Sequence, residues 1–264
     1  MTHPFALTGH AVFVTGAAKG MGRAITLELA TAGADIVLAG RDTAALESVA
    51  AEVRALGRTA LVHGCDITDE GSVRAAIDTA AATLSPDTWG LVNVAGGTGP
   101  SGKMVWEHTL EDVRTVFDVN LIGSFLTMKY FLPRMIAAGT GSVVNIGGTF
   151  GFKGVRQAWA YGATKWALRG LTKSAALEVG ARGVRVNMVS PGGVEGPRLT
   201  RQLGQAAERE GKPYEDVYDA FRATSAMKRM STDKDIAMAV LFLLGPGAAN
   251  ITGQDLLVDG GTIV

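Results

Sequence analysis

The sequence has few of the residues on which disulfide bonds, metal sites and membrane spans depend. It contains one cysteine, Cys65, among 264 residues, so no internal disulfide can form. Its four histidines have no spacing typical of metal ligands, and we expect no metal site. The longest apolar run, residues 236–244, is too short to cross a membrane, and the first residues do not resemble a signal peptide. The sequence therefore predicts a cytoplasmic protein that is not bound to a membrane.

An excess of either charge is also missing. Lysine and arginine together number 25, aspartate and glutamate also number 25, and the basic residues form no run or patch. This balance argues against a nucleic-acid partner and against an anionic membrane surface. Hydrophobic residues make up 47% of the chain and 35 residues are glycine, a composition that favours a globular protein with a large buried core.

Short apolar runs alternate with longer helical patterns along the chain. We predict strands at residues 12–15, 36–39, 60–63, 91–93, 143–146, 184–189 and 256–258. We predict helices at residues 21–32, 44–56, 73–84, 110–138, 158–180 and 233–244. The apolar runs are continuous, which is typical of strands covered on both faces. The pattern predicts an α/β fold, a single-domain Rossmann-type doubly wound parallel sheet of about seven strands with helices on both faces.

One segment, residues 192–232, interrupts this alternation. It contains no predicted strand, but two polar helical stretches at 199–210 and 214–224. A long excursion after the carboxyl end of a strand is where α/β sheets place substrate lids. A surface insertion without a role would show the same pattern. We predict one catalytic domain over residues 1–264, with a substrate lid at 192–232.

A glycine-rich loop connects the first predicted strand to the first predicted helix. Residues 15–22 read Thr-Gly-Ala-Ala-Lys-Gly-Met-Gly, with glycines at Gly16, Gly20 and Gly22. Glycines at such a turn let the backbone approach a pyrophosphate at the helix N-terminus, where free amides and the helix dipole favour an anion. The sequence lacks the pattern G-x-x-x-x-G-K-[ST], so an ATPase or GTPase is not expected. The loop therefore indicates a dinucleotide site.

The end of the second predicted strand distinguishes between the two nicotinamide dinucleotides. An acidic residue there would bind the ribose 2′-hydroxyl of NAD(H) and repel the 2′-phosphate of NADP(H). This strand is followed by Gly40 and Arg41, and a guanidinium is suited to a phosphate. Lys19 in the glycine loop could add a second positive charge. We predict NADP(H), while a shift of one residue would make Asp42 a ribose ligand.

A tyrosine and a lysine lie one helical turn apart within the predicted helix at 158–180. The spacing of Tyr161 and Lys165 puts the phenol and the ammonium on one helix face. A free tyrosine has a pKa of about 10, and a nearby cation lowers it, so the phenol could exchange a proton with a hydroxyl group. The pattern alone is weak evidence, because Tyr130 and Tyr218 precede arginines at the same spacing.

Taken together, the motifs resemble those of the short-chain dehydrogenase/reductase family. They span nearly the whole chain: the glycine loop, residues 93–96 (Asn-Val-Ala-Gly), Asn120, Tyr161 with Lys165, and residues 258–261 (Val-Asp-Gly-Gly). The resemblance implies that Tyr161 donates or accepts the proton, and that Lys165 holds the nicotinamide ribose and lowers the pKa of the tyrosine. It also implies that Asn120 orders a water molecule in a proton relay.

The resemblance further implies a cofactor site formed by several loops. Asp66 would contact the adenine ring, and residues 93–96 would line the adenine ribose. Pro191 and Gly192 would shape the nicotinamide side, with the backbone of Val194 near the carboxamide. The predicted cofactor-binding residues are Gly16, Lys19, Gly20, Met21, Gly22, Arg41, Asp66, Ile67, Asn93, Ala95, Gly96, Tyr161, Lys165, Pro191, Gly192 and Val194.

Two positions depart from the family pattern. The family usually has a serine thirteen residues before the tyrosine, where it polarises the carbonyl, and here that position is Gly148. A threonine expected for the nicotinamide amide is replaced by Gly196. Removing an oxyanion donor can lower a rate by about 10²–10³-fold. Thr149 is the nearest hydroxyl, and we predict that it replaces the missing serine, with a substrate hydroxyl or a water molecule as the alternatives.

We predict an NADP(H)-dependent oxidoreductase that interconverts a carbonyl and a secondary alcohol by hydride transfer. The predicted catalytic residues are Tyr161, Lys165, Asn120 and Thr149. The alternative is a catalytically idle NADP(H)-binding regulator or interaction protein on the same fold, which the missing serine favours. The intact set of asparagine, tyrosine and lysine favours the enzyme.

The substrate and the assembly are less closely defined. Aromatic and basic side chains gather in the loops after the fourth, fifth and sixth predicted strands: Trp106, Phe150, Phe152 and Trp159 with Lys103, Lys153, Arg156, Arg198 and Arg201. They could suit a small apolar molecule with an acidic group, or they could be solvated surface. The apolar helices at 110–138 and 158–180 correspond to family helices that pair across a two-fold axis, and the segment 251–264 to one that packs at a second axis. We predict a homotetramer, with a dimer as the next choice.

Overall fold

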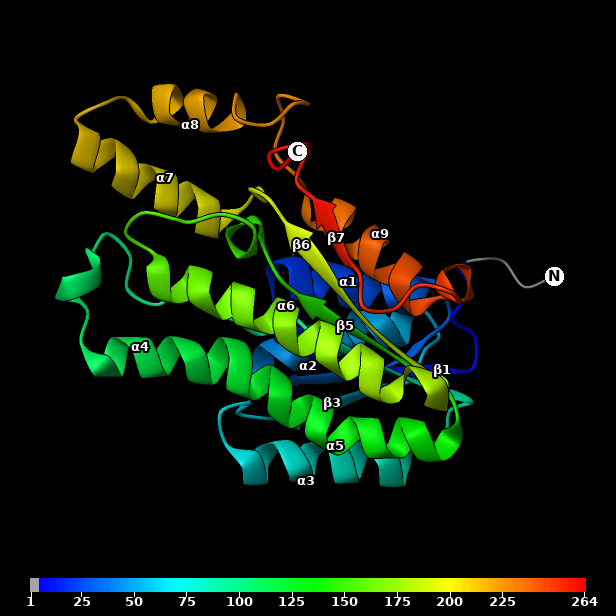
Figure 1. The fold of residues 1–264 in the computed structure, drawn as a ribbon. Helices are drawn as coiled ribbons and strands as arrows, with labels where there is room; N and C mark the ends of the chain where they lie inside the picture. Colours follow the sequence, from blue (N-terminus) through cyan, green and yellow to red (C-terminus); the bar gives the residue numbers. More distant parts are fainter. Residues whose placement is uncertain (1–4) are drawn as a thin grey trace.

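The computed structural model describes residues 5–264, in which seven strands form one sheet with helices on both faces (Figure 1). The strands are β1 (His10–Thr15), β2 (Asp35–Gly40), β3 (Ala60–Gly64), β4 (Thr88–Asn93), β5 (Gly141–Ile146), β6 (Val184–Pro191) and β7 (Asp255–Val258). All neighbouring strands are parallel, in the order β3-β2-β1-β4-β5-β6-β7. This confirms the predicted doubly wound parallel sheet. The strand order reverses between β1 and β4, and such a switch point leaves a crevice at the carboxyl ends of the strands.

The helices cover the sheet in two layers, and each layer has its own apolar core. They are α1 (Gly20–Thr31), α2 (Thr43–Ala55), α3 (Glu70–Thr83), α4 (Leu110–Phe117), α5 (Gly123–Ala138), α6 (Trp159–Val179), α7 (Pro197–Glu210), α8 (Tyr214–Arg222) and α9 (Asp233–Leu244). In β1, Val12 and Val14 pack against α1, α2 and α9, while Ala11 and Phe13 pack against α3, α5 and α6. The alternation follows from the two-residue period of a strand. It explains why the predicted strands are apolar throughout.

The helix predicted at residues 110–138 is interrupted near its middle. A π-helical turn, Asp118–Ile122, separates α4 from α5 and places Asn120 in its centre. The apolar pattern of the sequence continues through this turn and gave no sign of it. Such turns are rare in proteins, and many of those that are found lie at functional sites.

The segment after β6 forms two helices and no strand, as predicted, with one isolated bridge between Val194 and Ser231. α7 and α8 are drawn in yellow and orange, apart from the sheet (Figure 1). They share a small apolar cluster of buried Leu199, Leu203 and Met230, separate from the two main cores. The position of this cluster beyond the end of β6 makes the two helices one wall of the crevice. Among the helices of residues 5–264, none is both long and apolar enough to cross a membrane.

Candidate active site

The tyrosine and the lysine singled out in the sequence lie together at the N-terminal part of α6. The ammonium group of Lys165 is 5.4 Å from the centre of the Tyr161 ring, and its Nζ donates to the carbonyl of Ile146 at 2.9 Å. The lysine side chain is buried, with the residue 6% exposed. Because β5 ends at Ile146, this hydrogen bond fixes the ammonium at the carboxyl end of the sheet.

The charges around Tyr161 favour its phenolate form. Burial alone would raise the pKa of the phenol, but the positive charges of Lys165 and Arg198 outweigh burial and lower the pKa below its usual value. Arg198 lies at the start of α7, with its guanidinium carbon 5.7 Å from the centre of the tyrosine ring. A phenol in this setting exchanges a proton closer to neutral pH than a free tyrosine does.

The position of the missing serine faces this phenol. A Cβ atom added at Gly148 would lie 3.6 Å from Oη of Tyr161 and 3.9 Å from the carbonyl oxygen of Pro191. The amide of Gly148 donates to Oγ of Ser190, which is buried at the end of β6. Thr149 begins the short turn that follows and borders a cavity beside the phenol. The loop is therefore held in place without a hydroxyl at position 148 itself.

Asn120 connects the loop after β4 to α6. Its Oδ1 accepts from the amide of Gly97 at 2.8 Å, and its Nδ2 donates to the carbonyl of Gly97 and to Oγ1 of Thr164. The side chain is buried, and both of its donor hydrogens have partners within the protein. The side chain therefore has no donor hydrogen left for a water relay of the kind implied by the resemblance.

A cavity of about 140 Å³ opens beside the phenol. It is lined by residues from α1, α6, β6, α7, α8 and the loops between elements: Met21, Thr98, Gly147, Gly148, Thr149, Phe150, Tyr161, Pro191, Gly192, Gly193, Val194, Arg198, Leu199, Gln202 and Phe221. The lining is mainly apolar, with a few hydroxyl and amide groups, which is typical of a site for a small organic molecule. Arg198 is the one charged side chain among these lining residues.

The glycine loop has the close packing that a dinucleotide site needs. Gly16 has a positive φ of 67°, and a Cβ atom at Gly22 would collide with the carbonyl oxygen of Gly16. Gly20 also has a positive φ, and a Cβ atom there would meet nothing, so its backbone faces open space. Oγ1 of Thr15 accepts from the amides of Val94 and Ala95 and joins this loop to the end of β4. The bare backbone at the start of α1 is thus free to approach a phosphate.

The two charged residues that follow β2, Arg41 and Asp42, have different surroundings. Asp42 caps α2, and its Oδ1 accepts from the amide of Ala45 at 3.0 Å. Arg41 is exposed and, like Lys19, has no ion pair within residues 5–264. Two hydrogen bonds from Thr68 lower the pKa of Asp66, and the charge of Arg41 adds to this effect. Arg41 and Asp66 therefore lie on the same side of the crevice, where the adenosine end of a dinucleotide would fit.

The other predicted cofactor residues differ in what they can offer. The side chain of Asn93 is buried and bound to Asn145 and Thr127, so the segment 93–96 can present only its backbone and small side chains. Ile67 is buried in the core beside α5, with no room for a Cβ atom at Gly123. Pro191, Gly192, Val194 and Met21 all border the cavity. The bare backbone of the glycine loop and the exposed cations Arg41 and Lys19 fit the phosphates of a nicotinamide dinucleotide.

Sequence reasoning missed three residues that support the site. Ser190 holds the loop at Gly148, Thr164 positions Asn120, and Phe221 closes the far side of the cavity against Gly193. Ser190 directly precedes the Pro191-Gly192 motif and Thr164 lies between Tyr161 and Lys165, so both could have been suspected. Phe221 shares the spacing of an apolar helix face with Tyr214, Val217 and Tyr218, so its partial burial could have been predicted, but the sequence does not indicate that this face meets Gly193.

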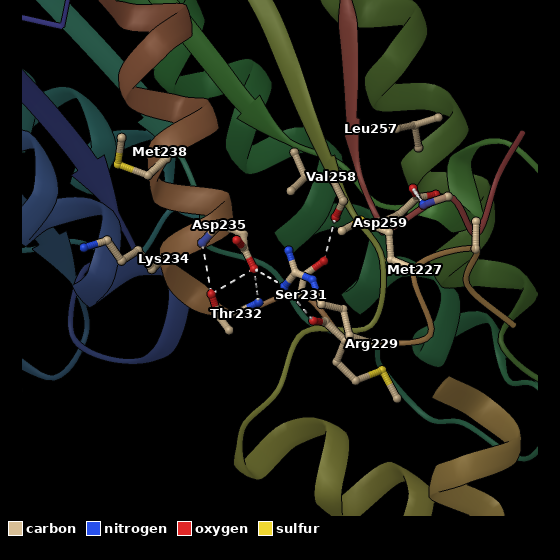
Figure 2. Close-up of a pocket in the computed structure, with 14 residues that line it drawn as sticks. Met227, Arg229, Ser231, Thr232, Lys234, Asp235, Met238, Leu257, Val258 and Asp259 are labelled. Atoms are coloured by element: carbon tan, nitrogen blue, oxygen red, sulfur yellow. Dashed lines mark hydrogen bonds and ion pairs between the residues drawn. The ribbon is translucent and has the colours of Figure 1, made fainter. Parts of the chain in front are cut away.

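A larger cavity, about 640 Å³, lies at the N-terminal end of α9 beside the C-terminal segment (Figure 2). Its polar groups already pair with one another. Arg229 bonds to Asp235, Thr232 and Asp235 cap α9 reciprocally, and Ser231 donates to the carbonyl of Val258 (Figure 2). Neither Tyr161 nor Lys165 lines it. Size alone does not make it the reaction site, which we place at the smaller cavity beside the phenol.

Comparisons with known proteins bear on the family and the fold of the chain. A family model described as enoyl-(acyl carrier protein) reductase matches residues 16–262. A protein from Xanthobacter autotrophicus named inactive 2-(S)-hydroxypropyl-CoM dehydrogenase 2 is 39% identical, over 87% of this chain and 95% of its own. A 2,5-dichloro-2,5-cyclohexadiene-1,4-diol dehydrogenase from Sphingobium indicum is 35% identical, over 97% of each chain. The crystal structure of NAD⁺-bound xylitol dehydrogenase superposes with a TM-score of 0.91 at 31% identity, covering 96% of this chain and 99% of that one.

The fold and the site together define a nucleotide-binding α/β oxidoreductase. The family model covers nearly the whole chain, and relatives above 30% identity align along most of their length. The chain belongs to the short-chain dehydrogenase/reductase family. Its relatives named above as alcohol and diol dehydrogenases support a carbonyl/alcohol oxidoreductase that uses a nicotinamide cofactor.

Proposed function

We propose that the protein is an NADP(H)-dependent oxidoreductase that interconverts a carbonyl and a secondary alcohol. The observation that carries this proposal is the placement of Tyr161 at the cavity, with Lys165 fixed behind it by the carbonyl of Ile146. A phenol with a lowered pKa, open to a cavity and backed by a buried cation, is suited to moving one proton to or from a hydroxyl group.

The chain's own residues divide the work of the reaction. The bound cofactor would accept or supply the hydride. In the oxidation direction Tyr161, as phenolate, removes the hydroxyl proton of the alcohol, and in the reduction direction the phenol returns it. Lys165 stabilises the phenolate throughout. Thr149, at the edge of the cavity, donates a hydrogen bond to the oxygen on which negative charge develops.

The preference for NADP(H) rests on charge. Arg41 and Lys19 are exposed and unpaired within residues 5–264, whereas the carboxylate of Asp42 is engaged at the start of α2. A 2′-phosphate would satisfy both cations, whereas one carboxylate oxygen of Asp42 is already engaged by the amide of Ala45.

A second candidate function is favoured by Gly148. Without the serine, the fold could bind the cofactor and serve as a catalytically idle regulator or interaction protein. The relative from Xanthobacter autotrophicus is itself named as inactive. A catalytically idle protein would not need Tyr161 at the cavity with Lys165 and Asn120 behind it, yet all three residues are present.

Three variants at the cavity test the proposal. We expect Tyr161→Phe to abolish NADPH-dependent reduction of a panel of ketones, diketones and quinones. Thr149→Ala should lower kcat by about tenfold or more, because an oxyanion donor is lost, and should leave the Kd of NADPH unchanged. Gly148→Ser should raise kcat, because there is room for its Cβ atom 3.6 Å from the phenol oxygen. The φ of Gly148, 159°, borders the region that side chains avoid, so the Tm of this variant serves as a control.

The outcomes separate the two candidate functions. If Thr149→Ala keeps the full rate while Tyr161→Phe is inactive, the donor is a water molecule or the substrate, and the role of Thr149 is wrong. If the parent protein binds NADPH but reduces no carbonyl of the panel, and Gly148→Ser creates activity, the idle NADP(H)-binding protein is the better description.

A further inference from the structure

Arg198 occupies an unusual place for an exposed cation. It lies in the first turn of α7, lines the cavity, and approaches the ring of Tyr161 to 5.7 Å. The arginine and the tyrosine are far apart in the sequence, and the fold of the segment after β6 brings them together. The guanidinium therefore lies at the point where a substrate would meet the phenol.

No carboxylate balances the charge of Arg198 at the cavity. No aspartate or glutamate lines the cavity, and Arg198 forms no ion pair within residues 5–264. The first turn of α7 has no acidic residue, so the positive end of this helix adds to the same field. Arg201 also has no ion pair within residues 5–264, but it does not line the cavity. Arg198 and the buried cation Lys165 both act on Tyr161, whose oxygen accepts a hydrogen bond from Arg198. While the phenol is protonated, a bound anion would balance this positive charge.

We propose that Arg198 binds a carboxylate of the substrate, and that the enzyme acts on hydroxy or oxo acids in preference to neutral alcohols and ketones. This proposal rests on the proposed function and names its substrate class. A guanidinium binds a carboxylate through two parallel hydrogen bonds, which would also orient the neighbouring carbon toward Tyr161. The apolar side chains of Phe150, Leu199 and Phe221 line the same cavity and would pack against the carbon skeleton.

A pair of molecules of the same shape tests the charge requirement without turnover. Benzoate and benzamide are titrated by calorimetry into the protein saturated with NADPH. We expect benzoate to bind at least about tenfold more tightly than benzamide, as befits a charge-assisted hydrogen bond. Arg198→Gln should make the two affinities equal. Arg201→Gln removes the same charge one turn along α7, outside the cavity, and should keep the preference for benzoate.

Other results would overturn the proposal. Equal binding of the two probes by the parent protein, or no binding of benzoate, leaves no anion site in the cavity. A preference that survives in Arg198→Gln, or that falls equally in Arg201→Gln, shows that this guanidinium is not the ligand. A Kd for NADPH that rises as much as the Kd for benzoate in Arg198→Gln assigns the residue to the cofactor instead. If Arg198→Gln removes the benzoate preference but the parent protein oxidises neither 2-hydroxy nor 3-hydroxy acids nor neutral alcohols, the proposed function fails while the anion site stands.

Discussion

At the scale of single residues, two neighbouring charges at the end of β2 have opposite consequences for the cofactor. The sequence left Arg41 and Asp42 as competing ligands, because a shift of one residue exchanges them. In the structure Asp42 caps α2 through the amide of Ala45, and Arg41 has no carboxylate partner within residues 5–264. The hydrogen bonds of a cap thus favour the arginine as the cofactor ligand.

We expect Arg41→Ala to weaken NADPH binding by about 1.5–3 kcal/mol, the cost of a hydrogen bond to a charged group. The affinity for NADH should stay nearly unchanged, since NADH has no 2′-phosphate. Fluorescence titration of both cofactors measures the two effects. Asp42→Asn is the matched control, because asparagine also caps helices and should leave both affinities as they are. Equal affinities of the parent protein for NADPH and NADH, or a loss of NADH binding in Asp42→Asn, would make Asp42 the ribose ligand.

At the scale of elements, α7 and α8 are attached to the rest of the molecule by a small apolar cluster of their own. Leu203 of α7 is buried in that cluster, and Tyr214, Val217, Tyr218 and Phe221 of α8 pack against it. The two helices supply Arg198, Leu199 and Phe221 to the cavity. We propose that they act as the substrate lid, because such a cluster can loosen without disturbing the two cores of the sheet.

We expect Leu203→Ala to loosen the lid locally, since removing a buried leucine side chain costs about 2–5 kcal/mol. Hydrogen exchange should speed up in residues 197–222, and the KM for the substrate should rise, while the Kd of NADPH and the exchange of β1 stay as in the parent protein. Leu241→Ala is the matched control, because Leu241 is equally buried but belongs to the core beneath α1 and α9. It should lower the Tm of the whole protein. A uniform rise of exchange in Leu203→Ala would show that the lid unfolds only together with the sheet.

At the scale of the whole molecule, apolar side chains remain exposed on the helices of one face. Phe125 on α5 and Trp166 and Leu177 on α6 are exposed by 44%, 50% and 86%. Large aromatic and aliphatic groups gathered on neighbouring helices are typical of an interface between subunits. They support the predicted assembly of several copies of the chain.

We expect light scattering at micromolar concentration to give four times the 27.4 kDa mass of one chain. Trp166→Lys should shift the mass toward a smaller species, because a charge would be buried at the interface. Leu56→Lys changes a similarly exposed apolar side chain at the end of α2 and should leave the mass unchanged. A monomeric parent protein would contradict the predicted tetramer. A dimer would mean that subunits pair across only one of the two predicted two-fold axes.

The sheet, most of the helices and the glycine loop could be predicted from the residues alone. These depend on interactions between residues close in the chain: the apolar period of strands and helices, and the glycines that permit the turn at residues 16–22. The predicted start of one helix was wrong by three residues because its N-cap was overlooked. α3 begins at Glu70 rather than at residue 73, because Asp69 caps it through the amide of Ser72.

The surroundings of the phenol depend on contacts between segments that are distant in the sequence. Arg198 reaches Tyr161 because β6 and the segment after it cross over the end of α6, and Ser190 holds Gly148 because β5 and β6 are neighbours. The π-helical turn at Asn120 depends in the same way on Gly97 and Thr164, its hydrogen-bond partners from other parts of the chain. Contacts between segments far apart in the sequence leave no periodic pattern in it. For that reason the motif for proton transfer could be predicted from the residues, whereas Arg198 was one of several basic loop residues in the sequence and only the folded chain brings it to the phenol.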